Sequence, residues 1–302
     1  MPPFTPTTPP NANSFPSPCK HLQAASQPGA RVARHSLLKP PMPPMPPPTR
    51  DTFPNAFEAV FLVACLFAAE FLIGTALYDA RAVLGMHTNE LMDLASVLGN
   101  GLLLTGVMQW TGLSYGSLFH PAKSSPAAVV GLLALPLLCV VPALTAGITA
   151  IEVGVVALFP VSASDAEMFE RMTSGGLISL LMICIVAPMV EEMLFRGVIL
   201  RSFLRQYDRW PAILGTALLF GLVHMNIYQC VAACITGTLM GWLYERTRSL
   251  WPSILLHASY NTAVMFGPDA SNGLSSLHWL LILVLVAAGT LMLRTLLLPR
   301  RP

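Results

Sequence analysis

Two adjacent carboxylates and an arginine stand inside a stretch of sequence that is otherwise apolar enough to cross a membrane. Residues 186–200 read VAPMVEEMLFRGVIL and contain Glu191, Glu192 and Arg196. An ionisable side chain at the centre of a bilayer costs about 2.5–3.5 kcal/mol on insertion scales, so such residues are retained mostly where they face a partner or a water-filled cavity. A spacing of four residues places Glu192 and Arg196 on one face of a helix. The sequence therefore predicts a polar site within the membrane.

Two histidines and an asparagine occupy later apolar segments. His224 follows Phe220 by one helical turn, and Asn261 follows His257 by the same spacing, which puts each pair on one helix face. At 1.5 Å per residue from the expected cytoplasmic helix ends, Glu191 and His224 lie at one level, roughly 18–20 Å deep. The other two lie at roughly 8–14 Å. We expect one polar pocket, open to the cytoplasmic side, to contain all four side chains.

These side chains are suited to hydrolysis by an activated water molecule. Glu191 with His224 can hold a water molecule and remove its proton. His257 and the Asn261 amide can donate hydrogen bonds to the oxyanion that forms when the water attacks a carbonyl group. No serine or cysteine nucleophile is needed, and no metal ion or other cofactor is expected.

Each of these residues also has an interpretation without chemistry. The Glu192–Arg196 pair, near the end of a long helix, can be a salt bridge that reaches toward the membrane surface. In the chemical interpretation Glu192, paired with Arg196, lies behind Glu191 and supports it without contacting the substrate. A lone His224 or His257 is more often a hydrogen-bonded packing residue. The chemical interpretation is favoured because four such groups coincide in three apolar segments at compatible depth.

The composition indicates a membrane protein with several spans. Of the 302 residues, 54% are hydrophobic and 11% are charged, and the mean hydropathy is +0.62. A net charge of +2, without a basic run interleaved with aromatic residues, excludes nucleic acid as a partner class. Five cysteines lie in apolar stretches and are expected to be buried thiols; Cys230 and Cys234, one turn apart, are a weak candidate for a metal site.

The first 54 residues differ from the rest of the chain. They contain 16 of the 27 prolines and no acidic residue before Asp51. Such a segment cannot bury a core, so we expect residues 1–54 to form a disordered proline-rich tail and residues 55–302 to form a transmembrane helical domain.

Apolar runs long enough to cross a hydrocarbon core of about 30 Å recur eight times from residue 55 onward. They lie near 56–78, 93–112, 127–158, 175–203, 211–227, 230–244, 252–267 and 275–298. The third is overlong and contains Pro136 and Pro142, so we expect it to be kinked or broken. The sixth and seventh are short. The sequence thus predicts an all-α, polytopic membrane protein with about eight transmembrane helices.

The charges of the connecting loops predict the orientation of the chain. With the basic N-terminal tail inside, the loops expected outside are net acidic and those expected inside are net basic, as cytoplasmic loops generally are. Both termini are therefore predicted to be cytoplasmic. For the membrane itself we favour a bacterial inner membrane over the endoplasmic reticulum or a plastid. Glu70 and Glu152, in the first and third spans, are further intramembrane carboxylates without an assigned role.

The order and spacing of these residues resemble the CAAX protease and bacteriocin-processing (CPBP, or Abi) family, also called type II CAAX prenyl endopeptidases. The sequence EEMLFR resembles the family's Glu-Glu-x-x-x-Arg motif, and FGLVH resembles its Phe-x-x-x-His motif. The third motif, a helix with small residues, a loop and then His-x-x-x-Asn, resembles residues 237–261, which contain the GxxxG pair Gly237 and Gly241. The resemblance covers a core at about residues 175–265.

The resemblance implies an eight-helix, metal-independent intramembrane glutamate peptidase. Glu191 and His224 would activate water, and His257 and Asn261 would stabilise the oxyanion. The expected partners are membrane lipid and a peptide or protein substrate, with or without a lipid anchor, because eukaryotic members cleave prenylated proteins whereas bacterial members are linked to peptide processing, bacteriocin immunity or scaffolding. Alternatives are a zinc metalloprotease, for which no HExxH motif is present, and a non-catalytic scaffold, immunity protein or transporter.

Overall fold

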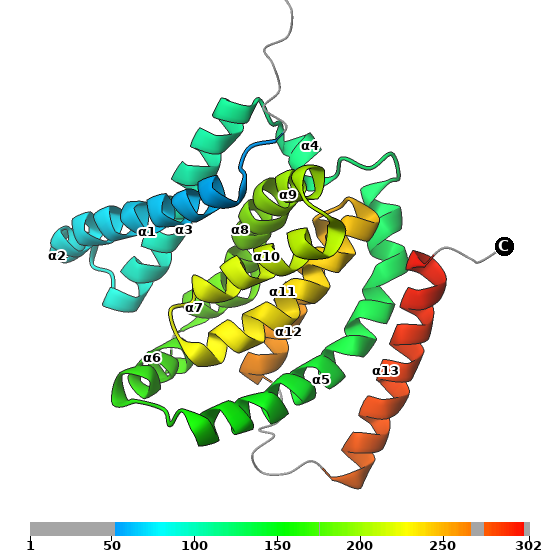
Figure 1. Ribbon diagram of the computed structural model, residues 1–302. Coiled ribbons are helices and arrows are strands. Elements are labelled where there is room, and N and C mark those ends of the chain that lie inside the picture. The colour runs from blue at the N-terminus through cyan, green and yellow to red at the C-terminus, as the bar shows by residue number, and fades with distance from the viewer. Residues whose placement is uncertain (1–51, 175, 267–274, 299–302) are drawn as a thin grey trace, which may run out of the picture. The chain divides into compact units, whose positions relative to one another are not determined.

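The computed structural model describes residues 52–174, 176–266 and 275–298. The tail predicted to be disordered lies outside the described residues except for positions 52–54. The described elements are all helices: α1 (Ala56–Asp79), α2 (Arg81–Leu84), α3 (Thr88–Thr111), α4 (Tyr115–Phe119), α5 (Pro126–Leu158), α6 (Ala163–Ser174), α7 (Leu177–Leu181), η1 (Met182–Val186), α8 (Ala187–Glu192), η2 (Met193–Leu200), α9 (Arg201–Gln206), α10 (Arg209–Leu222), α11 (Ile227–Thr247), α12 (Trp251–Phe266) and α13 (Ser276–Leu297) (Figure 1). The predicted all-α class is confirmed.

Each of the eight predicted spans lies on a helix, but the helices differ in length. Within the described ranges, six are long and apolar enough to cross a membrane: α1, α3, α5, the continuous helix from Leu177 to Gln206, α11 and α13. Helices α10 and α12 have 14 and 16 residues, or about 21 and 24 Å at 1.5 Å per residue, less than a hydrocarbon core of about 30 Å. The sixth span, predicted to be short, is instead the 21-residue α11. The protein is a polytopic helical membrane protein, and eight complete crossings remain a prediction.

Helix α5 is continuous despite its two internal prolines. It runs for 33 residues through Pro136 and Pro142, and Figure 1 shows it as one curved helix. Of the two expected outcomes, a kinked or a broken third span, the break is wrong: the helix continues in a curve, although each proline removes one backbone donor from it. Helix α13 packs closely on this region, because a Cβ atom at Gly289 would lie 2.7 Å from the Pro136 carbonyl oxygen.

Local sequence signals set the ends of the helices. The side chain of Asn55 accepts a hydrogen bond from the Glu58 N–H, and the Glu58 carboxylate accepts one from the Asn55 N–H, so a capping box begins α1. Asn226 begins α11 in the same way by accepting from the Gln229 N–H at 2.8 Å. Helix α3 ends at Gly112, whose φ of +70° suits glycine.

Four segments that the charge pattern groups on one side of the membrane meet at one end of the helical domain. The Ala56 N–H donates to the Tyr207 hydroxyl oxygen at 3.0 Å, Arg201 donates to the Ser117 carbonyl at 2.6 Å, and the Leu250 N–H donates to the Phe119 carbonyl at 2.9 Å. These contacts join the start of α1 and the α3–α5, α9–α10 and α11–α12 connections. We call this end the basic end, and its cytoplasmic location remains a prediction.

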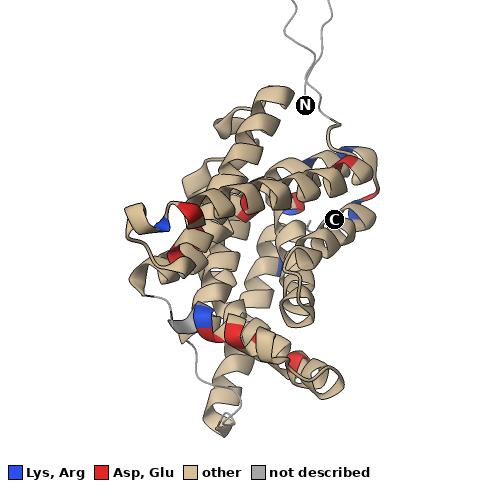
Figure 2. Cartoon of the chain, turned by 90° about the vertical axis from the view of Figure 1, so that its left-hand side faces the viewer, with Lys and Arg blue, Asp and Glu red and all other residues tan. Residues whose placement is uncertain are grey.

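Charged residues are sparse along the described helices. Figure 2 shows most of the surface of the helices without them and several together on α6, which carries Asp165, Glu167, Glu170 and Arg171. Helix α6 follows α5, so it lies away from the basic end. The apolar surfaces of α1 and α13 are almost entirely unburied within the protein, as expected for helices that face lipid.

Candidate active site

The helix that carries Glu191 and Glu192 is continuous but irregular. Two π-helical segments, η1 and η2, flank the short α8. Such wider turns are rare and occur frequently at functional sites. Here they change the rotation between side chains on either side of α8, which itself contains Glu191 and Glu192.

Pro188 explains part of this irregularity. In the π-helical pattern the Ile183 carbonyl would accept from the N–H of residue 188, but proline has none. The preceding N–H, that of Ala187, is bonded to the Met182 carbonyl. The side-chain amide of Asn261 donates to the Ile183 carbonyl instead, at 2.9 Å. Asn261 therefore ties α12 to the irregular helix at a position where the backbone lacks a donor.

Glu192 and Arg196 form a fully buried ion pair. The Arg196 guanidinium donates to Glu192 Oε1 at 2.7 Å and to the Gly237 carbonyl of α11 at 3.0 Å. The His257 ring nitrogen Nδ1 lies 3.1 Å from the same Glu192 oxygen. Breaking such a pair by removing one partner leaves an uncompensated buried charge, which costs about 3–5 kcal/mol. The predicted contact between Glu192 and Arg196 is present, and it joins three helices.

One aromatic ring contacts both histidines and the arginine. The Arg196 Cζ atom lies 4.6 Å from the centre of the Phe220 ring, close enough for a cation–π interaction. The rings of His224 and His257 meet the Phe220 ring edge to face, with centroids 5.2 and 5.6 Å apart. Phe220 thus fixes the relative positions of three polar side chains from three different segments.

The small residue at position 237 allows this packing. A Cβ atom at Gly237 would lie 3.2 Å from the Arg196 Nη2 atom and 3.1 Å from Phe220 Cδ1. Both contacts are tighter than ordinary van der Waals distances. The GxxxG pair is therefore a packing motif, and its first glycine also supplies the carbonyl that binds Arg196.

Both histidines are oriented so that Nε2 is the free ring nitrogen. His257 Nδ1 faces the Glu192 carboxylate, and His224 Nδ1 lies 2.9 Å from the Phe220 carbonyl oxygen. Because a carboxylate and a carbonyl oxygen only accept, each Nδ1 carries the proton that is donated. The Nε2 of His257 then lies 3.8 Å from Glu191 Oε2. Each Nε2 is left available for a water molecule or a substrate.

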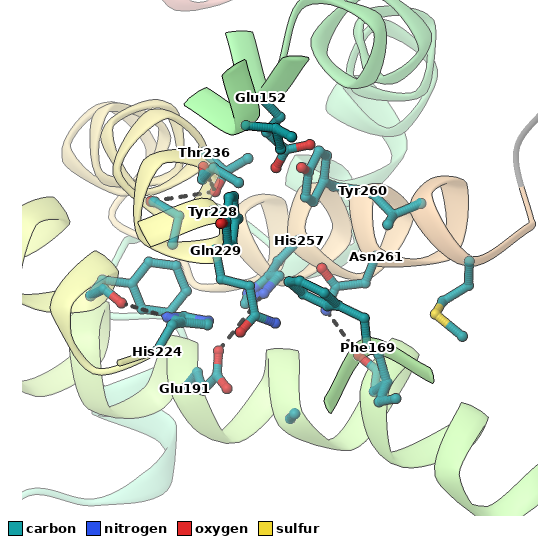
Figure 3. A pocket seen from close by; sticks show the side chains of 18 of the residues that line it. Glu152, Phe169, Glu191, His224, Tyr228, Gln229, Thr236, His257, Tyr260 and Asn261 are labelled. Atoms are coloured by element: carbon teal, nitrogen blue, oxygen red, sulfur yellow. Dashed lines mark hydrogen bonds and ion pairs between the residues drawn. The ribbon is translucent and has the colours of Figure 1, made fainter. Parts of the chain in front are cut away.

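These groups face a cavity of about 480 Å³. Its walls include Glu152, Glu191, His224, His257, Tyr260 and Asn261 (Figure 3). The side chain of Glu191 retains 28% of its exposure, whereas that of Glu192 is fully buried. Of the two adjacent carboxylates, Glu191 is therefore the one that can reach a ligand.

The cavity lies toward the end of the domain opposite the basic end. Val161, which follows α5, and Phe169 of α6 line it. The Tyr228 hydroxyl donates to the Phe159 carbonyl at 2.8 Å and joins the start of α11 to this region. The expectation that the pocket opens on the side of the basic loops is wrong. A depth of about 18–20 Å is nearly the full length of α10, which ends at Leu222, so His224 lies in the turn beyond that helix.

The structure brings all six predicted site residues together. Four of them, Glu191, His224, His257 and Asn261, line the cavity, and Glu192 and Arg196 lie behind it. The sequence interpretation assigned no contact to Pro188, and it gave Glu152 no role. In the described ranges no three His, Cys, Asp or Glu side chains are grouped so as to hold a metal ion, and Cys230 and Cys234 are free thiols.

Comparison with known proteins identifies the segment that holds this site. Residues 173–263 match the family model described as "Type II CAAX prenyl endopeptidase Rce1-like". This segment is Rce1-like. It includes every predicted site residue and begins after α5, so α1, α3 and α5 lie outside it.

Two curated relatives share a stretch of similar sequence with this chain. The chain is 31% identical over 81 residues to the Bacillus subtilis (strain 168) protein named "Putative membrane peptidase YdiL". The aligned stretch covers 27% of this chain and 33% of the relative. The chain is also 31% identical over 139 residues to an Escherichia coli protein named "Uncharacterized 24.3 kDa protein". This alignment covers 42% of the chain and 64% of the relative. The chain thus spans less than two thirds of either relative. No solved structure matches.

Proposed function

We propose that this protein is an intramembrane peptidase that hydrolyses a peptide bond with a water molecule activated by Glu191. The observation that carries the proposal is the placement of the Glu191 carboxylate in a cavity that both histidines also line. The likeness of residues 173–263 to type II CAAX prenyl endopeptidases supports the same reaction class.

In this mechanism Glu191 and the neutral His224 hold the attacking water. Glu191 takes a proton from the water as its oxygen forms a bond to the peptide carbonyl carbon, and the carbonyl oxygen becomes an oxyanion. The carbon–nitrogen bond then breaks, the proton passes from Glu191 to the leaving nitrogen, and the products are a carboxylic acid and an amine. No covalent enzyme intermediate is formed.

In the proposed mechanism His257 and Asn261 stabilise the oxyanion. When protonated, His257 carries an N–H on Nε2 that can donate to the oxyanion, while Nδ1 keeps its hydrogen bond to Glu192. The Asn261 amide has two N–H groups, of which one is used by the Ile183 carbonyl and one remains. Arg196 holds Glu192 in place through their ion pair, so its role is one of positioning.

Peptide profiling tests the proposal directly. Membrane peptides from cells that express the wild-type protein are compared by mass spectrometry with those from cells that express Glu191→Gln. The wild-type protein should yield defined cleavage products, and Glu191→Gln should yield none. Glu245→Gln, which removes a carboxylate at the basic end, should match the wild type. Identical peptide profiles for the wild type and Glu191→Gln would exclude the peptidase and favour the non-catalytic alternative.

Chelation separates this mechanism from zinc hydrolysis. If Glu191 activates water without a metal, a strong chelator should leave the cleavage rate of the purified protein unchanged, and zinc should not bind stoichiometrically. Loss of activity that returns on addition of zinc would instead assign Glu191, His224 and His257 as ligands.

A further inference from the structure

A third carboxylate faces the cavity and takes no part in the hydrolysis mechanism. Glu152 lies on α5, six residues before the end of that helix, and lines the cavity with Tyr260 of α12. Figure 3 shows Glu152 and Tyr260 on the wall across from Glu191 and His224. Among the described residues, no hydrogen bond or ion pair to the Glu152 carboxylate is found. An intramembrane carboxylate without a partner is costly, so it is expected to have a function.

The described cavity wall carries carboxylates but no lysine or arginine. Its lining residues in the described ranges include two carboxylates, Glu152 and Glu191, and neither lysine nor arginine. Arg196 is fully buried behind Glu192 and is paired with it. The rest of the lining is mostly apolar, with polar side chains such as Gln229 and Thr236. His257, which is protonated in the proposed mechanism, lies beside Glu191. A negatively charged group near Glu152 would therefore meet a like charge, with no lysine or arginine among the described lining residues to offset it.

We propose that Glu152 forms a subsite for a positively charged side chain, so that the peptide cleaved at Glu191 carries a lysine or arginine close to the cleaved bond. This inference rests on the proposed function and names the substrate class of that site. A basic side chain would pair with Glu152, and its aliphatic stem would pack against the apolar wall. A charge held in a partly enclosed cavity interacts more strongly than one at a surface.

The subsite also separates this protein from an enzyme that removes a C-terminal tripeptide. The terminal carboxylate of such a substrate would need a cation or a set of donors, and Glu152 would repel it. Since α5 lies outside the Rce1-like segment, the catalytic groups and the selecting group come from different parts of the chain. Substrate choice can therefore differ between proteins that share the catalytic residues.

The experiment uses three matched libraries of N-acetylated, C-amidated peptides that differ only in whether one residue is Lys, Gln or Glu. Cleavage by the full-length protein in lipid vesicles is measured for the wild type, Glu152→Gln and Glu152→Lys. Binding of the same peptides is measured on Glu191→Gln protein, with and without each Glu152 substitution. Glu245→Gln serves as the matched loss of a carboxylate outside the cavity, and thermal unfolding checks that each variant is folded.

The wild type should prefer Lys peptides. Glu152→Gln should raise KM for them about tenfold with a smaller change in kcat, and Glu152→Lys should shift the preference to Glu peptides. Equal cleavage of all three libraries by the wild type, or a ranking unchanged in Glu152→Lys, would overturn the inference and leave the peptidase intact. Charge-selective binding that depends on Glu152, without cleavage by the wild type, would support the subsite and contradict the proposed function.

Discussion

At the scale of single residues, the two adjacent carboxylates have different surroundings. Glu192 is enclosed by Arg196 and His257, whereas Glu191 faces the cavity. Adjacent positions on a helix point about 100° apart, so one helix can use the first carboxylate for a ligand and the second for its own neighbours. This division explains why the chain places two acids where one would already be costly.

Adding a single Cβ atom at Gly237 tests the packing of Arg196 and Phe220 around this position. The Cβ atom of Gly237→Ala would press on Arg196 and on the Phe220 ring, so we expect a loss of about 1–3 kcal/mol in stability and reduced cleavage as the Glu192–Arg196 pair shifts. Thermal unfolding in detergent and the cleavage rate measure both effects. Gly131→Ala in α5 is the control, since a Cβ atom there meets nothing within 4 Å. Equal unfolding temperatures and rates for the two variants would contradict this packing role of Gly237.

At the scale of helices, motif spacing predicted which residues meet, but not how the backbone allows it. The i,i+4 spacings placed Glu192 beside Arg196 and His257 beside Asn261, as a regular helix requires. The π-helical segments on either side of α8 have no simple sequence signal, because they depend on packing against α12 as much as on Pro188. Helix ends were less predictable still, and His224 was placed inside a span that ends at Leu222.

The contact between Asn261 and the Ile183 carbonyl can be measured by a double-mutant cycle. Asn261→Ala leaves the half-buried Ile183 carbonyl without a donor and should cost about 1–3 kcal/mol of stability. In a Pro188→Ala background the N–H of residue 188 can take over, so the same change should cost less there. Thermal unfolding of the wild type, the two single variants and the double variant gives the coupling free energy between Asn261 and Pro188.

Activity distinguishes the two uses of the Asn261 amide. If the amide also stabilises the oxyanion, cleavage should remain low in the double variant even though its stability is recovered. Strictly additive losses of stability would show that the Ile183 carbonyl has another donor, and Asn261 would then not replace the backbone donor that Pro188 lacks.

At the scale of the whole molecule, composition and loop charges predicted the membrane class and the grouping of loops at one end. They could not predict where the cavity opens, since that depends on how α5 and α6 pack against the turn between α10 and α11. The cavity lies toward the end of the described helices that is opposite the basic end, so the orientation of the chain decides from which side of the membrane a substrate reaches it. A cytoplasmic basic end would place the cavity nearer the outer side of the membrane.

Single-cysteine labelling of cells tests this arrangement. On a background without native cysteines, Ser162→Cys lies on the α5–α6 connection near the cavity and Asp208→Cys lies at the basic end. A membrane-impermeant maleimide should label the first in intact cells and the second only after the membrane is opened. The reverse pattern would show that the orientation predicted from charge is wrong, and labelling of both from one side would contradict the placement of the cavity.

The most direct measurement of the central claim is the cleavage rate of one identified substrate by wild-type and Glu191→Gln protein that unfold at the same temperature. If Glu191 removes the proton from the attacking water, the variant should lose a factor of about 10²–10⁴ or more in rate while its fold is retained. A rate within twofold of the wild type would contradict the assignment of Glu191 as the general base.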